Sequence, residues 1–157
     1  MLIRPTAEAA SQARDAATRA QQLAPGSPHT AIARGVYAMV VEEESERGLE
    51  ILRAGRRHSP NSVDLVIFEG LGLREVGRGD EAITAFLHAR SLDPRSKQVA
   101  DELAHTMLRA HRFDEAEREA DRSLAFDSTD VAVLTYKAMA RLGRGDLAGA
   151  RDVARLA

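Results

Sequence analysis

Apolar residues recur along this chain at steps of three and four positions, with polar residues between them. Such spacing is typical of helices that bury one face. The clearest stretch predicts one helix from about Val63 to Val76 and a second from about Glu81 to Leu92, separated by a turn at residues 77–80. Glycines in this turn permit its backbone conformation, and Pro94 cannot continue the second helix.

The pattern repeats every 34 residues, with one extra residue between Ala13 and Gly48. Small residues in fixed columns allow the two helices of a repeat to approach closely, and Ala104 is expected to face Ala116. Each helix pair needs neighbours to bury its remaining faces, so the pattern predicts a stack of pairs. The columns that keep the step are Gly70, Ala104 and Ala138; Gly48, Ala82, Ala116 and Ala150; and Pro60, Pro94 and Ser128.

These columns resemble the tetratricopeptide repeat. The best repeat carries the resemblance in Gly70, Leu73, Gly77, Asp80, Glu81, Ala82, Ile83, Phe86, Ala89, Leu92, Asp93 and Pro94. The next repeat fits almost as well, although Ala120 stands where a large aromatic residue is usual. The resemblance covers essentially the whole chain and implies an all-α fold, a right-handed α-solenoid of antiparallel helix pairs. It implies a single domain over residues 1–157, with repeats at 1–28 (partial), 29–62, 63–96, 97–130 and 131–157 (partial).

One repeat departs from the pattern of the others. The repeat at 29–62 has Gly48 and Gly55 where alanine is usual, and an acidic run at residues 42–46 occupies its turn. The helix boundaries are therefore hardest to predict in this repeat.

Composition limits the classes of function. Lys and Arg number 22 and Asp and Glu 24 among the 157 residues, for a net charge of -2. Acidic and basic residues are interleaved, so the chain has no basic footprint and we expect no nucleic-acid partner. No stretch is apolar enough for a membrane span or a signal peptide, and the absence of cysteine fits a reducing compartment. We therefore expect a cytoplasmic protein without a membrane association.

No arrangement of residues indicates catalysis. The absence of cysteine removes thiolate nucleophiles and thiolate-ligated zinc. The five histidines include no pair spaced four residues apart, and no serine lies in the glycine-flanked elbow of a hydrolase. We expect no metal, no cofactor and no enzymatic activity.

The densest basic cluster contains Arg53, Arg56 and Arg57, followed by His58. Cations near the C-terminal end of a helix complement its dipole, so a solvated helix end is the favoured interpretation. Docking on phosphate or on an acidic partner is the alternative. Binding to RNA or DNA would weaken steeply with added salt.

The resemblance also implies a binding surface, because first helices of tetratricopeptide repeats line a concave groove that holds an extended peptide or a partner helix. Steps of three and four place such sets as Asp101, His105 and Arg109 on one stripe of a helix. The aliphatic and aromatic members could instead belong to the core. Carried over by position, the groove contains Arg34, Tyr37, Ile67, Phe68, Leu71, Arg74, Asp101, Glu102, His105, Arg109, Tyr136 and Met139.

We therefore predict a non-catalytic protein-interaction module that binds a peptide or a partner helix. The alternative is a regulatory or oligomerising arm of a longer bacterial signalling or transcription-regulating protein. Both ends of the chain stop inside a repeat. This favours the interpretation that the chain is part of a longer array, and that a homodimer through the terminal repeats is possible. The Ala- and Gln-rich first helix could instead be a cap.

Overall fold

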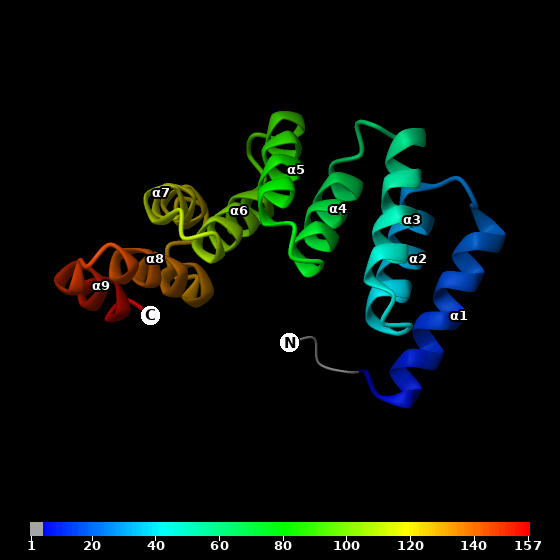
Figure 1. The fold of residues 1–157 in the computed structure, drawn as a ribbon, viewed down its shortest axis with the longest axis horizontal. Helices are drawn as coiled ribbons and strands as arrows, with labels where there is room; N and C mark the ends of the chain where they lie inside the picture. Colours follow the sequence, from blue (N-terminus) through cyan, green and yellow to red (C-terminus); the bar gives the residue numbers. More distant parts are fainter. Residues whose placement is uncertain (1–4) are drawn as a thin grey trace. The chain divides into compact units, whose positions relative to one another are not determined.

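The computed structural model describes residues 5–157, and every regular element in this range is an α-helix (Figure 1). The all-α prediction is confirmed. The chain divides into two compact units, the first ending at Arg78 and the second beginning at Gly79. The first unit contains α1 (Ala7–Leu23), α2 (Pro28–Val40), α3 (Ser45–His58) and α4 (Val63–Glu75). The second contains α5 (Gly79–Leu92), α6 (Lys97–Arg109), α7 (Phe113–Leu124), α8 (Val131–Gly143) and α9 (Leu147–Ala154).

The first helix of each of four repeats begins at a side-chain cap. In α2 and α4, the hydroxyls of Ser27 and Ser62 accept backbone N–H groups three residues later, at 3.1 and 3.4 Å. In α6 and α8, Ser96 and Asp130 do the same at 3.3 and 3.1 Å. A cap satisfies a backbone donor that has no partner inside the helix, so these residues fix where each first helix starts.

The helices of the first unit pack in chain order, α1 on α2, α2 on α3 and α3 on α4, and α4 also lies beside α2. The α2 and α3 backbones approach too closely for side chains at two positions. A Cβ atom on Gly48 would lie 2.6 Å from the carbonyl oxygen of Gly35, and one on Gly35 would lie 2.7 Å from Leu52 Cγ. This contact explains why glycine replaces the usual alanine at position 48.

The second unit builds its stack with alanine. Here α5 packs on α6, α6 on α7, α7 on α8 and α8 on α9, and α6 also lies beside α8. Ala104 on α6, Ala120 on α7 and Val133 on α8 form one buried cluster, against which Leu124 and Tyr136 pack. Alanine methyl groups therefore lie between these helices, whereas α2 and α3 leave no room for a side chain at Gly35 and Gly48.

The predicted boundaries need small corrections. Helix α4 ends at Glu75, one residue before the predicted end, and α5 begins at Gly79, two residues before the predicted start. The turn depends on Gly77, whose φ of 79° is the left-handed conformation that favours glycine. Asp80 and Glu81 lie in the first helical turn of α5, where negative charge complements the helix dipole. The single domain and its repeat boundaries stay predictions.

Within residues 5–157, no helix combines the length and the apolar character needed to cross a membrane.

Candidate functional site

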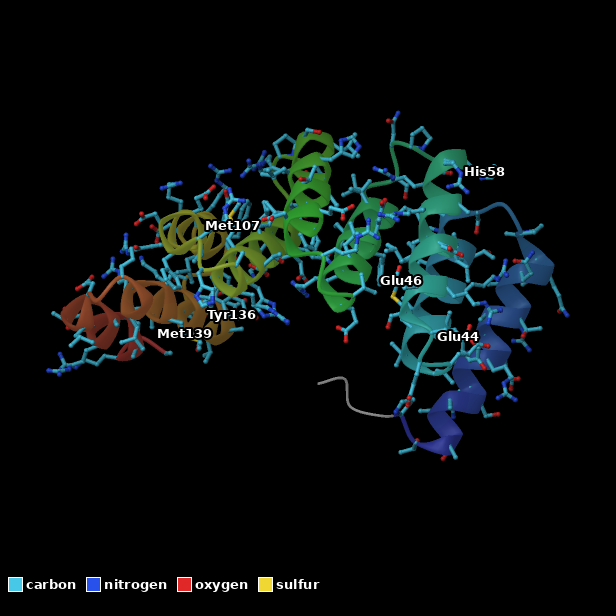
Figure 2. All side chains as sticks on the ribbon, viewed as in Figure 1. Glu44, Glu46, His58, Met107, Tyr136 and Met139 are labelled. Atoms are coloured by element: carbon cyan, nitrogen blue, oxygen red, sulfur yellow. The ribbon has the colours of Figure 1, made fainter. Side chains whose placement is uncertain are left out.

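Two predicted groove residues in the second unit lie against each other. The His105 ring on α6 stacks on the Tyr136 ring on α8, with centroids 4.9 Å apart and planes inclined by 4°. Figure 2 shows Tyr136 and Met139 on the same helix, where the Met139 side chain is 52% exposed. We call His105, Tyr136 and Met139 the aromatic platform. It joins the first helices of two successive repeats.

Charged residues border the aromatic platform on α6. Arg109 is exposed in the last turn of the helix, and Glu102 is half-buried. Asp101, which the sequence placed in the groove, also has structural partners. It accepts a hydrogen bond from the Ser123 hydroxyl on α7 and pairs with Lys97 at 2.9 Å. Asp101 therefore helps to hold α6 against α7.

Lys97 also joins α6 to the cap of α8. Its Nζ lies 2.7 Å from Asp130 Oδ2. Donation to Asp130, and secondarily to Asp101, raises the pKa of Lys97 above its ordinary value. The pKa of Asp130 is lowered, first by the hydrogen bond from Lys97 and then by the backbone N–H of Val133. Both ion-pair members stay charged near neutral pH.

An apolar groove of about 510 Å³ opens in the first unit between α1, α2 and α4. Two predicted residues, Tyr37 and Phe68, lie in its wall. The Tyr37 hydroxyl accepts a hydrogen bond from Arg14 Nε at 3.0 Å, which places one cation near the groove. Among residues 5–157, the lining consists of Pro5, Ala9, Ala13, Ala16, Ala17, Ile32, Ala33, Val36, Tyr37, Val40, Val41 and Phe68.

The other predicted residues of the first unit do not line the apolar groove. Arg34 is exposed and donates to Gln21 Oε1 on α1 at 2.9 Å. Leu71 and Arg74 on α4 are half-buried. Ile67 is only 2% exposed, so its side chain belongs to the core and offers almost no surface to a partner.

Two of the three arginines in the basic cluster on α3 pair with one buried carboxylate. Glu69 on α4 is nearly inaccessible, and its two oxygens lie 3.3 Å from Arg53 Nε and 2.7 Å from Arg56 Nε. Arg57 remains exposed at the end of the helix. Arg53 and Arg56 therefore connect α3 to α4 through ion pairs, and the cluster is not a fully solvated helix end.

Within residues 5–157, no group of three or more His, Cys, Asp or Glu side chains could hold a metal ion.

Sequence reasoning missed the part that α1 plays in the apolar groove. Ala9, Ala13 and Ala16 on α1 line it, opposite larger aliphatic residues of α2. The signal was available, because Ala13 occupies the small-residue column once the extra residue is counted.

Comparisons with known proteins identify the class of fold. No model of a known protein family matches the chain, and no curated protein matches it. Solved structures do: MamA AMB-1 superposes with a TM-score of 0.78 at 19% identity, over 94% of this chain and 90% of that one. YrrB, described as a tetratricopeptide protein with an unusual peptide-binding site, gives 0.76 at 13% identity, over 93% and 76%.

A chain of the Cut9-Hcn1 hetero-tetramer of the APC/C gives a TM-score of 0.81 at 16% identity, over 92% of this chain and 28% of that one. Likeness at this level of identity establishes the fold. The tetratricopeptide-type solenoid of helix pairs, expected from the residue columns, is therefore confirmed.

Proposed function

We propose that the protein is a non-catalytic interaction module that binds a peptide or a partner helix on its first helices. The observation that supports this proposal is the aromatic platform, where His105 and Tyr136 stack across α6 and α8 beside the exposed Met139. Aromatic side chains supply large contact areas with few rotatable bonds, and methionine adapts to differently shaped partners. The peptide-binding site in the description of YrrB is consistent with this use of the fold.

The residues we assign to the binding surface are those that the structure leaves accessible. Glu102 and Arg109 border the aromatic platform and would select a partner by charge. In the first unit, four of the predicted groove residues keep exposed surface: Tyr37, Phe68, Leu71 and Arg74. Ile67 does not. The proposal includes no enzymatic step and no cofactor, and we place the protein in the cytoplasm, consistent with its lack of cysteine.

The aromatic platform can be tested by partner capture. Tyr136→Ala and Met139→Asp should each reduce retention of specific proteins from a lysate of the source organism by at least tenfold, because central aromatic and apolar anchors carry most of the binding energy. Quantitative mass spectrometry of the retained proteins measures the loss. Thr135→Ala, a change at an exposed position of α8, is the matched control.

Circular dichroism of each variant establishes whether the helices are intact. Equal retention by wild type and by both folded variants would reject the aromatic platform as the binding surface. Loss of helical signal in Tyr136→Ala would assign that ring to the core instead.

A second candidate function is self-association through the last repeat, as an oligomerising arm. It is supported by large apolar residues that are exposed on α8, on α9 and just after α9, with Leu142 at 55%, Leu147 at 64% and Leu156 at 71%. Contiguous exposed apolar side chains are typical of association surfaces. Sedimentation should then show a concentration-dependent dimer that Leu147→Asp abolishes, and a monomer at all concentrations would reject it.

A further inference from the structure

The first unit contains a second pocket, which differs from the apolar groove in its charge. It has a volume of about 430 Å³ and opens between α1, α2 and α3. Each of these helices contributes one arginine to its lining: Arg14, Arg34 and Arg47. We call this site the arginine pocket. In the part of the chain that the structure describes, Glu42 is the one acidic residue that lines it, so positive charge predominates.

Two of the three arginines donate to neutral oxygens. Arg14 Nε lies 3.0 Å from the Tyr37 hydroxyl, and Arg34 Nη1 lies 2.9 Å from Gln21 Oε1. A guanidinium group has five N–H donors and stays protonated in proteins, so one bond to a neutral oxygen leaves its charge and its other donors available. The described residues provide neither Arg14 nor Arg34 with an ion pair.

The third arginine pairs with the carboxylate of the pocket. Arg47 Nη1 lies 3.0 Å from Glu42 Oε2 and 2.7 Å from Glu44 Oε2. Glu42 therefore neutralises Arg47. The positive charges of Arg14 and Arg34 remain without a carboxylate partner among the described residues.

The repeat identifies the corresponding positions in the second unit. Ala13 on α1 and Ala116 on α7 lie 103 positions apart, which is three 34-residue periods and the one extra residue. The helix caps Ser27 of α2 and Asp130 of α8 lie the same distance apart in the chain. Helices α1 and α2 can therefore be compared with α7 and α8, residue by residue, at this step.

In the second unit, the cation that corresponds to Arg34 has an anionic partner. Lys137 on α8 occupies this position, and its Nζ lies 2.5 Å from Asp121 Oδ1 on α7. The residue of α1 that corresponds to Asp121 is Thr18, which lines the arginine pocket. The basic residue is thus present in both units, whereas its carboxylate is present only in the second.

The position of Arg14 differs even more between the units. The corresponding residue of α7 is Glu117, which forms ion pairs with Arg141 and Arg144 of the following helix and its cap. Helix α1 therefore has Thr18 and Arg14 where α7 has two paired carboxylates. The interface that the chain neutralises internally in the second unit carries an excess of positive charge in the first.

We propose that the arginine pocket binds a phosphate monoester, which supplies the negative charge that α7 supplies in the second unit. A phosphate monoester carries a charge of about -1.5 to -2 at neutral pH, which matches the two arginines that lack a carboxylate. Guanidinium groups donate paired hydrogen bonds to phosphate oxygens. Thr18 and Gln22 add neutral donors to the lining, and Ile51 adds apolar surface for the organic part of the ligand.

Methyl phosphate is the smallest probe of this chemistry. Calorimetric titration of the intact protein should show saturable binding at slightly basic pH, where the ester carries both charges. Dimethyl phosphate, which carries one charge, should bind about tenfold more weakly, because it neutralises only one of the two arginines. Equal affinity for the two compounds would contradict the assignment of a dianion.

Two larger probes distinguish the sources of such a group. Glycerol phosphate represents a phosphorylated small molecule, and a short phosphoserine peptide represents a phosphorylated side chain of a protein. The probe that binds more tightly than methyl phosphate identifies the source, because its organic part then contacts the remaining lining. Unphosphorylated glycerol and the serine peptide should not bind the pocket.

Protein variants locate the site. Arg14→Gln and Arg34→Gln should each weaken the binding of methyl phosphate about tenfold, because each removes one charge-assisted contact. Arg19→Gln is the matched control, since Arg19 is an exposed arginine of α1 that does not line the pocket. An equal loss in Arg19→Gln would mean that methyl phosphate responds only to net charge, and would overturn the proposal.

A further variant restores the carboxylate of the second unit. Thr18→Asp places an acid at the position of Asp121, where it can pair with Arg34, and should weaken binding about tenfold without lowering the unfolding temperature. Thr18→Asn adds no charge and should bind methyl phosphate as wild type does. This pair keeps the proposal testable if either arginine variant fails to fold, as judged by circular dichroism.

Two other results would overturn the proposal: no saturable binding of methyl phosphate at millimolar concentration, or binding that the arginine variants and Thr18→Asp leave unchanged. The arginine pocket belongs to the first unit and the aromatic platform to the second. Tyr136→Ala should therefore leave phosphate binding unchanged, and the two sites can fail or succeed independently.

Discussion

The helix pairs α2 with α3 and α6 with α7 occupy the same repeat positions, yet they achieve their contact differently. Gly48 on α3 and Ala116 on α7 share a column, and Ala116 is completely buried. At Gly48, a Cβ atom would lie 2.4 Å from Met39 Cγ and 2.6 Å from the carbonyl oxygen of Gly35. The comparison shows that the same repeat pattern accommodates two distances between the backbones of paired helices. Glycine occupies this column where the backbones are close, and alanine where they leave room for a methyl group.

Each unit also contains a buried carboxylate, and the two carboxylates differ in how close their second arginine lies. Glu69 has one arginine nitrogen at 2.7 Å and another at 3.3 Å, both from α3. Glu119 on α7 has Arg90 from α5 at 2.7 Å, but its second arginine, Arg122, is 3.8 Å away. Each carboxylate ties together helices that are separate in the chain. The first unit thus contains both the glycine contact of α2 with α3 and Glu69, the carboxylate with two nearby arginines.

The largest effect is expected at the close contact. Gly48→Val should lower the free energy of unfolding by about 3 kcal/mol, because the new side chain meets a backbone oxygen that cannot rotate away. Ala116→Gly, at the same column, should cost only about 1 kcal/mol through helix propensity. Denaturant unfolding followed by circular dichroism measures both.

Gly26→Val is the control for adding a side chain, since no atom lies within 4 Å of the Cβ position there. Its unfolding free energy should change by less than about 0.5 kcal/mol. A Gly48→Val protein as stable as this control would show that the α2 and α3 backbones can separate at little cost.

The buried carboxylates should give intermediate losses. Glu69→Gln should cost about 2 kcal/mol and Glu119→Gln about 1 kcal/mol, because the first substitution leaves two closely paired arginines without their anion. Arg53 and Arg56 are partly exposed and regain water, which keeps the loss below that of a fully buried pair. Equal losses in the two variants would contradict an effect of the second arginine.

The smallest effect depends on pH. The pKa of Asp130 is lowered in the folded protein by Lys97 and by the Val133 N–H, so its stabilisation is present above the unfolded pKa of about 3.9 and is lost as pH falls through the folded pKa. Asp130→Asn should therefore cost about 0.5 kcal/mol at neutral pH, and the difference from wild type should shrink below about pH 4.

Unfolding of both proteins across this pH range measures the difference. Asp152→Asn, at an exposed position of α9, should show no comparable change. A gap for Asp130→Asn that stays constant down to pH 2 would mean that its charge contributes no stability.

Much of the helical architecture could be predicted from the repeat. The predicted span of Val63 to Val76 differs from α4 by one residue, because the Gly77 turn and the apolar spacing are local signals. The cap column of Ser27, Ser62, Ser96 and Asp130 was a further local signal in the sequence that the prediction did not use. It marks the start of each first helix more sharply than apolar spacing does.

The candidate site was less predictable. Phe68 and Tyr37 both line the apolar groove, whereas the neighbouring Ile67 is buried, although all three lie on first helices. Helical spacing separates the faces of a helix but does not say which neighbour covers each face. The pairing of Glu69 with Arg53 and Arg56 likewise joins residues 13 to 16 positions apart, and no local pattern reports it.

The sequence by itself determined the helices, their turns and the 34-residue register, because backbone conformation and apolar spacing depend on residues within a few positions of one another. Only the tertiary structure decided that α2 and α3 touch at glycine, that Asp101 accepts a hydrogen bond from Ser123, and that alanines of α1 line an apolar groove. These features depend on which helices lie side by side, and burial, ion pairing and grooves are properties of that packing.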